Sequence, residues 1–479
     1  MLKAMLSPSM RAGLLGLFLA SCAPLEALPS GAPPQAPNVV LLFTDDQGYG
    51  DLSCFGHPTI HTPNVDRLAA EGAKLTQFYV ASPVCTPSRA ALLTGCYPKR
   101  VGMQKHVVFP RSDYGLHPNE VTLAEVLKTK GYATGMFGKW HLGHREGFLP
   151  NDQGFDRFFG VPYSNDMAQF HRKPDTKYEL YLPLMRDGKV IEWEPDQREL
   201  TRRCTQEALQ FIDEVHEQPF LLYVPYSMPH LPIYASAEFQ GKSNRGTYGD
   251  VIEEIDWSVG EIMEKLDELE LTDKTLVIFT SDNGPWLEYM HKGGSAGPLR
   301  GGKATNWEGG QRVPCVMRWP GVIPAGSLRR ELLTTMDIFP TLSKWARVTE
   351  PPKTKLDGRD VGSLLRGLGA QGWNPANAPF LYYTAHGELA GIRRGPWKLL
   401  IEANEFYNVD VDISEQWDKA EDHEGLIEEL HALALRLDHE IESNARPVGR
   451  SDVLRFDPAK PMNPDGSAFQ MADEARIPE

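Results

Sequence analysis

The segment CTPSRAALLTG, residues 85–95, places a cysteine where a helix is predicted to begin. Thr86 is a good capping residue, Pro87 suits the first helical position, and the AALL run that follows favours a helix. Free backbone N–H groups and the helix dipole at such an end favour an anion, and Arg89 adds a positive charge nearby. Cys85 is therefore a candidate nucleophile. The alternative is a buried cysteine that only packs the start of the helix.

Four short apolar runs are each followed by polar side chains that could do chemistry. The runs and their polar residues are NVVLLFT (38–44) with Asp45 and Asp46, YATGMF (132–137) with Lys139 and His141, PFLLYV (219–224) with His230, and TLVIFT (275–280) with Asp282 and Asn283. Runs that are apolar throughout are typical of strands buried on both faces of a parallel sheet. Amphipathic helices are predicted between them, at 62–72, 122–131 and 251–269, which indicates an α/β sandwich. Ligands of such sheets bind beyond the carboxyl ends of the strands, so we expect these polar residues to share one cleft.

The residue types in these clusters fit the hydrolysis of an anionic ester. Ligands that offer only oxygen suit a hard cation such as Ca²⁺ or Mg²⁺, and the candidates are Asp45, Asp46, Asp282 and Asn283. Positive charge for a tetrahedral anion is offered by Arg89, Lys139 and Lys303, the last within LRGGKATNWEGG (299–310). His141 and His230 could exchange protons near neutral pH. The residues alone predict a metal-assisted hydrolase and leave sulfate and phosphate esters equally open.

The composition and the N-terminus indicate an exported, acidic protein. A formal net charge of −15 over 479 residues argues against a nucleic-acid partner. The first 22 residues combine a basic start, a short apolar core and the sequence LASC, so we expect a signal peptide that ends at a lipidated Cys22. A Pro/Ala linker at 23–37 follows, and no later stretch is apolar enough to cross a membrane. We therefore expect a periplasmic or outer-membrane lipoprotein of a bacterium, attached to the membrane only by this anchor. Up to two disulfides could form among Cys54, Cys96, Cys204 and Cys315.

Several motifs together resemble one family. CTPSRAALLTG resembles the C-x-P-S-R signature of the type I, formylglycine-dependent sulfatases, which belong to the alkaline phosphatase superfamily. The order of the other motifs is similar to that in the arylsulfatase A and galactosamine-6-sulfatase branch of that family, and these motifs are DDQGYGD (45–51), GKWHLG (138–143), GVPYSND (160–166), SDNGP (281–285), GKATNWEGG (302–310) and GIRRGPWKL (391–399). The likeness extends over residues 38–420.

The resemblance implies a role for each candidate residue. Cys85 would be oxidised during export, by a formylglycine-generating enzyme that recognises the PSR turn, to formylglycine, an aldehyde whose hydrate attacks sulfur. A Ca²⁺ site, also open to Mg²⁺, falls on Asp45, Asp46, Asp282, Asn283 and the modified Cys85. Arg89 would hold the hydrated aldehyde, and the lysines that grip sulfate oxygens are matched by Lys139 and Lys303. His141 would help to expel sulfate, His230 would protonate the leaving alcohol, and Ser164 would line the site.

The resemblance also implies an architecture. The fold would be a large, mostly parallel mixed sheet between helices, followed by a smaller α+β domain with a four-stranded antiparallel sheet. Short strands are expected within 380–401 and a closing amphipathic helix at 424–443. We therefore expect a catalytic domain at 38–372 and a C-terminal subdomain at 373–445. The tail at 446–479 has no periodic pattern and is expected to be irregular or to wrap back over the body.

The predicted activity is hydrolysis of sulfate monoesters on a sulfated saccharide, with galactose or N-acetylgalactosamine sulfates favoured. The alternatives are a phosphomonoester or phosphonate hydrolase that uses the same site, and a carbohydrate-binding lipoprotein whose cysteine is never modified. Five residues lie near family positions that could contact the sugar, although each is as compatible with an ordinary surface role: Asn165, Asp166, His171, His291 and Arg300.

Overall fold

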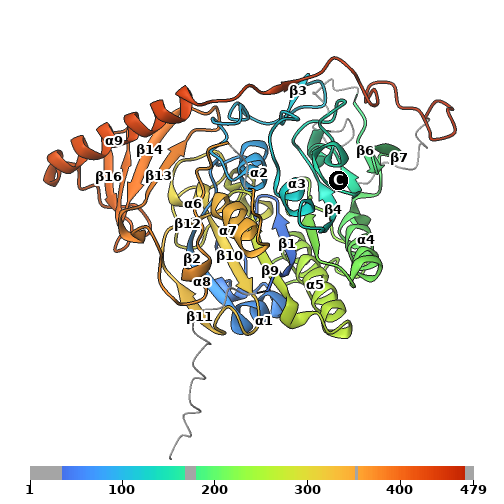
Figure 1. The fold of residues 1–479 in the computed structure, drawn as a ribbon, viewed down its shortest axis with the longest axis horizontal. Helices are drawn as coiled ribbons and strands as arrows, with labels where there is room; N and C mark the ends of the chain where they lie inside the picture. The colour runs from blue at the N-terminus through green and yellow to red at the C-terminus, as the bar shows by residue number, and fades with distance from the viewer. Residues whose placement is uncertain (1–34, 168–179, 351–353, 470–479) are drawn as a thin grey trace, which may run out of the picture. The chain divides into compact units, whose positions relative to one another are not determined.

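The computed structural model describes residues 35–167, 180–350 and 354–469, and a sheet of eleven strands runs through it (Figure 1). Its middle strand is β1 (Asn38–Thr44), which pairs in parallel with β8 (Phe220–Pro225) on one side and β9 (Thr275–Ser281) on the other. On the far side of β8 lies β4 (Ala133–Lys139), also parallel. The four apolar runs of the sequence are thus four adjacent strands, in the order β9-β1-β8-β4.

The outer strands make the sheet mixed. β5 (Arg157–Val161) is parallel to β4, whereas β10 (Arg312–Arg318) runs antiparallel between β9 and β2 (Ala73–Tyr79). The short edge strands are β6 (Pro183–Arg186), β7 (Lys189–Trp193), β11 (Ser327–Arg329) and β12 (Leu333–Thr334). The predicted mostly parallel mixed sheet is confirmed, with its parallel strands at the centre.

Helices cover both faces of the sheet, and every residue of β1 is therefore buried. Val40 and Leu42 pack into one hydrophobic core with three helices, which are α1 (Pro63–Glu71), α4 (Leu200–Val215) and α5 (Thr247–Glu268). Val39 and Leu41 face the opposite core, whose helices are α2 (Cys85–Thr94), α3 (Leu123–Lys128), α7 (Ile338–Trp345) and α8 (Gly362–Leu365). The alternating side chains of a fully buried strand therefore hold both layers together.

A second sheet of four antiparallel strands follows in the chain, as predicted. Its strands are β13 (Pro379–Tyr383), β14 (Leu389–Arg394), β15 (Trp397–Leu400) and β16 (Glu405–Asn408). The long helix α9 (Glu424–Ser443) lies along this sheet (Figure 1), and buries Leu430 and Ala434 against it. After α9 the chain returns to the main body, where β17 (Gly449–Arg450) pairs with β3 (Tyr114–Gly115). The tail therefore wraps back over the body through its described residues.

The possible disulfides do not form among the described residues, where Cys54, Cys85, Cys96, Cys204 and Cys315 are all free thiols. The signal peptide, Cys22 and most of the linker lie outside the described residues. So does His171. In the described part of the chain, every helix is too short or too polar to cross a membrane. The described residues belong to one compact unit, and the predicted boundaries at 372–373 and 445–446 stay predictions.

Candidate active site

Four oxygen-bearing side chains meet where β1 and β9 end. The parallel pairing of Thr44 with Ser281 sets the residues that follow side by side, and the Asp282 N–H donates to the Thr44 carbonyl at 3.0 Å. Asp46 has a positive φ of 64°, and its N–H donates to Asp282 Oδ1 at 3.1 Å. Asn283 Nδ2 in turn donates to Asp46 Oδ1 at 2.7 Å. Asp45, Asp46, Asp282 and Asn283 are all buried, and their carboxyl and amide groups face one another.

This cluster fits a divalent cation. Asp45 Oδ1 and Asn283 Oδ1 are buried and have no hydrogen-bond partner in the structure, although buried polar atoms rarely remain unpaired. Ligand atoms of Asp45, Cys85 and Asp282 lie within 4.8 Å of one another, and so do those of Asp45, Asp46 and His230. Oxygen donors of this kind suit Ca²⁺ or Mg²⁺.

Cys85 lies beside this cluster as the first residue of α2. The predicted cap is wrong in detail, because the helix begins at Cys85 itself and the capping position is Val84, whose backbone is extended. The hydroxyl of Thr86 instead donates to the His141 carbonyl at 2.8 Å and accepts from the Val108 N–H at 3.1 Å. Burial raises the pKa of the Cys85 thiol to about 11, although Lys139 and nearby cations act in the opposite direction. The unmodified thiol is therefore protonated at neutral pH.

Arg89, one turn into α2, is completely buried and joins three parts of the site. Its Nε and Nη2 both donate to Asp282 Oδ2, at 3.0 and 2.8 Å, and Nη1 donates to the Lys139 carbonyl at 2.9 Å. Its Nη2 also lies 3.5 Å from Asp45 Oδ2. Burial and the neighbouring Asp45 charge raise the pKa of Asp282 to about 7, and Arg89 opposes this shift. Such crowding of carboxylates is the arrangement that a cation relieves.

Two lysines contact the two neighbouring carboxylates of Asp45 and Asp46. Lys139 Nζ, at the end of β4, contacts Asp45 Oδ2 and donates to Ser164 Oγ at 3.0 Å. Lys303 Nζ donates to Asp46 Oδ2 at 2.7 Å. Burial would raise the pKa of Asp45, but Lys139 and other cations lower it well below the usual range, so this carboxylate is ionised. Three cations therefore converge on the carboxylates, as a site for a tetrahedral anion requires.

The two histidines each present one ring nitrogen to the site. His141 has a positive φ of 64°, its Nε2 lies 3.0 Å from the Val108 carbonyl, and its buried Nδ1 has no partner. His230 directs Nδ1 to the Leu231 carbonyl at 2.6 Å, and its Nε2 lies 3.6 Å from Asp46 Oδ2. Because a carbonyl only accepts, His141 carries its proton on Nε2 and His230 on Nδ1. Burial lowers the pKa of both rings.

Comparison with known proteins identifies this arrangement. A family model described as Sulfatase matches residues 37–348. The chain belongs to the sulfatase family. A second model, described as N-sulphoglucosamine sulphohydrolase, C-terminal, matches residues 302–437. The enzyme is therefore a sulfuric ester hydrolase.

Similar proteins extend over most of this sulfatase. Arylsulfatase A of Homo sapiens is 43% identical over 393 residues, which cover 78% of this chain and 76% of that protein. N-acetylgalactosamine-6-sulfatase of Mus musculus is 42% identical over 395 residues, covering 78% of this chain and 73% of that protein. The crystal structure of Ps i-CgsB in complex with k-i-k-neocarrahexaose has a TM-score of 0.74 and 29% identity, and covers 88% of this chain and 95% of that one.

The residues expected to contact a sugar differ in burial and in their protein partners. Asn165 is buried and donates to Gln197 Oε1 and the Pro232 carbonyl, so it has a structural role. Arg300 donates to the Glu415 carbonyl at 2.9 Å, and its guanidinium lies 3.4 Å from the centre of the Trp307 ring. His291 is exposed, and Asp166 is partly buried. Asn165 and Arg300 are thus engaged by other protein groups.

The sequence reasoning missed Trp286, which borders the site. Its ring lies 5.6 Å from that of His230, and Lys303 Nζ lies 4.3 Å from its centre. An aromatic residue three positions after Asn283, within the run SDNGPW, was the available signal.

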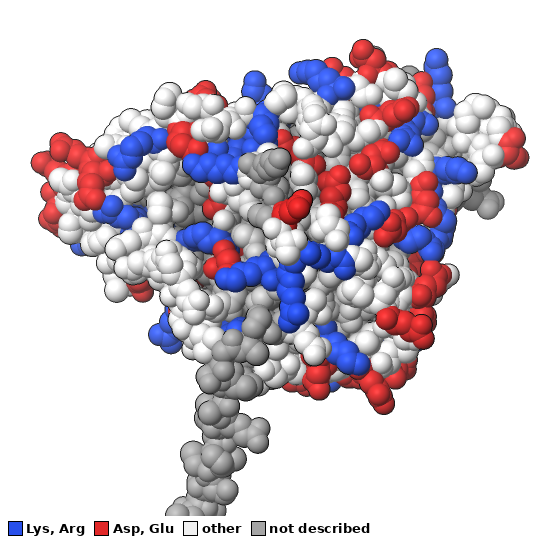
Figure 2. All heavy atoms as spheres, in the orientation of Figure 1, with Lys and Arg blue, Asp and Glu red and all other residues white. Residues whose placement is uncertain are grey.

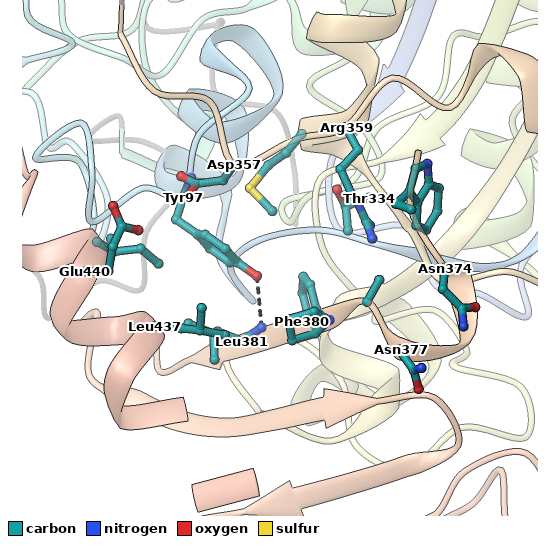
Figure 3. A pocket seen from close by; sticks show the side chains of 15 residues that line it. Tyr97, Thr334, Asp357, Arg359, Asn374, Asn377, Phe380, Leu381, Leu437 and Glu440 are labelled. Atoms are coloured by element: carbon teal, nitrogen blue, oxygen red, sulfur yellow. Dashed lines mark hydrogen bonds between the residues drawn. The ribbon is translucent and has the colours of Figure 1, made fainter. Parts of the chain in front are cut away.

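One cavity of the sulfatase lies away from this site. A space of about 380 Å³ opens between the main body and the second sheet, lined by residues that include Tyr97, Arg359 and Glu440 (Figure 3). Tyr97 accepts from the Leu381 N–H through its hydroxyl at 2.9 Å. Because Tyr97 follows the C-terminal end of α2, this cavity is at the opposite end of that helix from Cys85. It holds none of the predicted catalytic residues.

The surface in view carries both signs of charge. On the face shown in Figure 2, lysine and arginine side chains are interspersed with aspartate and glutamate. With a formal net charge of −15, the whole molecule repels anions at long range. Capture of a sulfate ester therefore depends on the local cations Arg89, Lys139 and Lys303.

Proposed function

We propose that this sulfatase removes sulfate from carbohydrates, with galactose or N-acetylgalactosamine sulfates as the substrate class, using formylglycine made from Cys85 and a Ca²⁺ ion. The observation that carries the proposal is the buried cluster in which Cys85 lies within 4.8 Å of two carboxylates, beside two unpartnered oxygen atoms. The galactosamine and oligosaccharide ligands named for similar proteins support the sugar class.

The four side chains Asp45, Asp46, Asp282 and Asn283 would hold the cation, with the group at position 85 as a further ligand. When bound, the cation would withdraw charge from a sulfate oxygen, and formylglycine would supply a hydrated aldehyde as the nucleophile. The buried, protonated thiol of unmodified Cys85 is a poor nucleophile, which agrees with a need for this modification.

The chain's own cations and histidines would do the remaining work. Lys139 and Lys303 would bind sulfate oxygens, and Arg89 would orient the group at position 85 through its bonds to Asp282. His141 would accept a proton at its unpartnered Nδ1. Once it has also taken up a proton on Nε2, which lies 3.6 Å from Asp46 Oδ2, His230 would deliver that proton to the leaving oxygen, while its Nδ1–H stays bonded to the Leu231 carbonyl. One water is consumed, and an alcohol and sulfate are released.

The test is the mass of the tryptic peptide that contains residue 85, from protein made in its native host or with a maturing enzyme. A loss of about 18 Da, the change from CH₂SH to an aldehyde in a nucleophile of this type, is expected. Cys85→Ala should abolish turnover, and a Cys85→Ala enzyme with wild-type rates would overturn the proposal. An unmodified thiol without turnover would favour a binding role instead.

We also propose that the enzyme is exported and anchored through a lipid on Cys22, and that it acts on chain ends or short oligosaccharides. The LASC sequence supports the anchor, and the acidic body supports the preference for short chains, because it repels long sulfated polymers. Cys22→Ala should move the enzyme from the membrane fraction to the soluble fraction. Faster sulfate release from intact polymer than from oligosaccharides would refute the preference for short chains.

A further inference from the structure

We propose that Trp286, with Glu288 at its edge, forms the subsite for the sugar ring that carries the sulfate; this inference rests on the proposed function. Trp286 leaves the end of β9 three residues after Asn283, so it borders the predicted cation site on the outer side. The backbone here is held on both sides, because the Lys303 N–H donates to the Pro285 carbonyl at 2.9 Å and the Tyr289 N–H donates to the Trp286 carbonyl at 3.1 Å.

The indole lies where a leaving group must lie. Its ring centre is 5.6 Å from that of His230, which is placed to protonate the leaving oxygen, and 4.3 Å from Lys303 Nζ, which is placed to bind sulfate. The leaving oxygen is bonded both to sulfur and to the first carbon of the leaving group. That carbon therefore lies within a few ångströms of both side chains, and a ring attached to it lies against Trp286.

Side chains become more exposed between Lys303 and Trp286. His230 and Asp46 are nearly fully buried, and the side chain of Lys303 is 9% exposed. Trp286 is half-buried, and Tyr289 beyond it is 41% exposed. The buried, charged side chains therefore form a closed pocket for sulfate, and the more exposed rings of Trp286 and Tyr289 form an aromatic wall at its opening.

The wall has the two features that a pyranose ring requires. The indole is held by Tyr289, whose ring meets it edge to face at 4.7 Å, and the exposed part of this half-buried indole would offer an apolar contact to the C–H face of a sugar. Glu288 lies beside the indole, with Oε2 3.4 Å from Trp286 Nε1, and its exposed carboxylate offers acceptors to sugar hydroxyls. An aromatic surface with a few convergent polar groups is typical of small-molecule subsites. A sterol or simple aryl group would use the ring but not the carboxylate.

The test measures binding, so that it does not depend on modification of Cys85. In a Cys85→Ala background with Ca²⁺ present, calorimetry would compare inorganic sulfate with the 6-sulfates of galactose and N-acetylgalactosamine. Adding Trp286→Ala should weaken sugar binding about tenfold, the loss expected for an aromatic face, and leave sulfate binding within twofold. Trp286→Phe should retain most of the affinity, and Glu288→Gln should weaken only the sugars. Trp417→Ala is the matched control, because this tryptophan is 61% exposed on the C-terminal part.

Each other outcome overturns either the inference or the proposed function on which it rests. An equal loss for sulfate and sugar would make Trp286 a positioning residue for Lys303. Binding of sulfate but of neither sulfated sugar, or a loss confined to 4-nitrophenyl sulfate or a steryl sulfate, would make the pyranose assignment wrong. An active wild-type enzyme that hydrolyses sulfated sugars, with a Trp286→Ala variant that binds them normally, would refute the subsite and leave the proposed function standing. A wild-type protein that carries formylglycine and turns over no sulfated sugar would refute the proposed substrate class instead.

Discussion

Lys398 is a buried cation outside the active site whose removal should destabilise the fold measurably. It lies on β15, is fully buried, and its Nζ is 3.1 Å from Glu308 Oε1 and 2.6 Å from Glu415 Oε1. Glu308 has other partners, since Tyr382 donates to it at 2.9 Å and Arg312 lies 3.4 Å away. Among the described residues, Glu415 has no other cation in contact with its carboxylate. Lys398→Met should therefore leave Glu415 as a buried acid without a counter-ion, although it keeps its hydrogen bond from the Glu308 N–H at 2.7 Å.

The magnitude follows from the cost of neutralising that acid. Burial already raises the pKa of Glu415 against the opposing effect of Lys398, so without the lysine the carboxyl should take up a proton. A glutamate in an unfolded chain has a pKa of about 4.3, and each pH unit above it costs about 1.4 kcal/mol. Keeping Glu415 protonated thus costs about 3.7 kcal/mol at pH 7 and about 1 kcal/mol at pH 5. Breaking a buried ion pair costs a similar amount, roughly 3–5 kcal/mol.

The sign of the pH dependence makes the reasoning testable. In the variant the folded state holds the Glu415 proton more tightly than the unfolded state, so stability falls as pH rises above about 4.3. Urea unfolding followed by tryptophan fluorescence, at pH 5 and pH 7, would measure the free energy of unfolding of variant and parent. The double variant Lys398→Met/Glu415→Gln should recover at least about 2 kcal/mol at pH 7, because no buried acid remains. An equal loss at both pH values, or no recovery in the double variant, would refute an unpaired carboxylate as the cause.

Three further predictions concern the active site. EDTA should abolish turnover and lower the melting temperature, and Ca²⁺ should restore both, because a ligand that binds only the folded state stabilises it; unchanged melting and turnover in EDTA would argue against the cation site. Lys303→Met should lower kcat/KM for a sulfate ester about 10²- to 10³-fold, as for other lost oxyanion contacts, and a change below fivefold would contradict its role. Gly284→Ala should cost more than about 2 kcal/mol in urea unfolding, because its Cβ would lie 1.7 Å from the Gly309 carbonyl oxygen. The matched Gly425→Ala, in α9 with open space around it, should be neutral or stabilising, and equal effects of the two would exclude the clash.

The central strands could be predicted because each is a continuous apolar run, a pattern that depends only on local sequence. β1, β4, β8 and β9 were found in this way, and α9 coincides with the predicted 424–443. The edge strands β6, β7 and β11 were missed, since all three are short and carry no clear period, and β7 and β11 are also partly exposed. Their pairing is decided by long-range contacts that a local pattern does not contain.

The candidate site was predictable for a related reason. The polar residues directly follow predicted strands, so topology alone brings Asp45, Lys139 and Asp282 to one edge of the sheet. Contacts between distant segments were not predictable, and the ion pair between Lys398 and Glu308 joins residues 90 positions apart. The capping role assigned to Thr86 failed in the same way, because its hydroxyl is used by the distant His141 carbonyl.

The two halves of the active site differ in how much the sequence reveals about them. The sulfate half is built from charged side chains fixed at strand ends and buried together, so the chemistry of its ligand can be inferred from residue types. The leaving-group half depends on loop residues such as Trp286 and Glu288, whose positions follow from packing rather than from a motif. The role of a residue in that half can be inferred only once its distance to His230 and Lys303 is known. The substrate class must therefore be inferred from the structure of the 285–292 loop, whereas the reaction can be inferred from the residues at the strand ends.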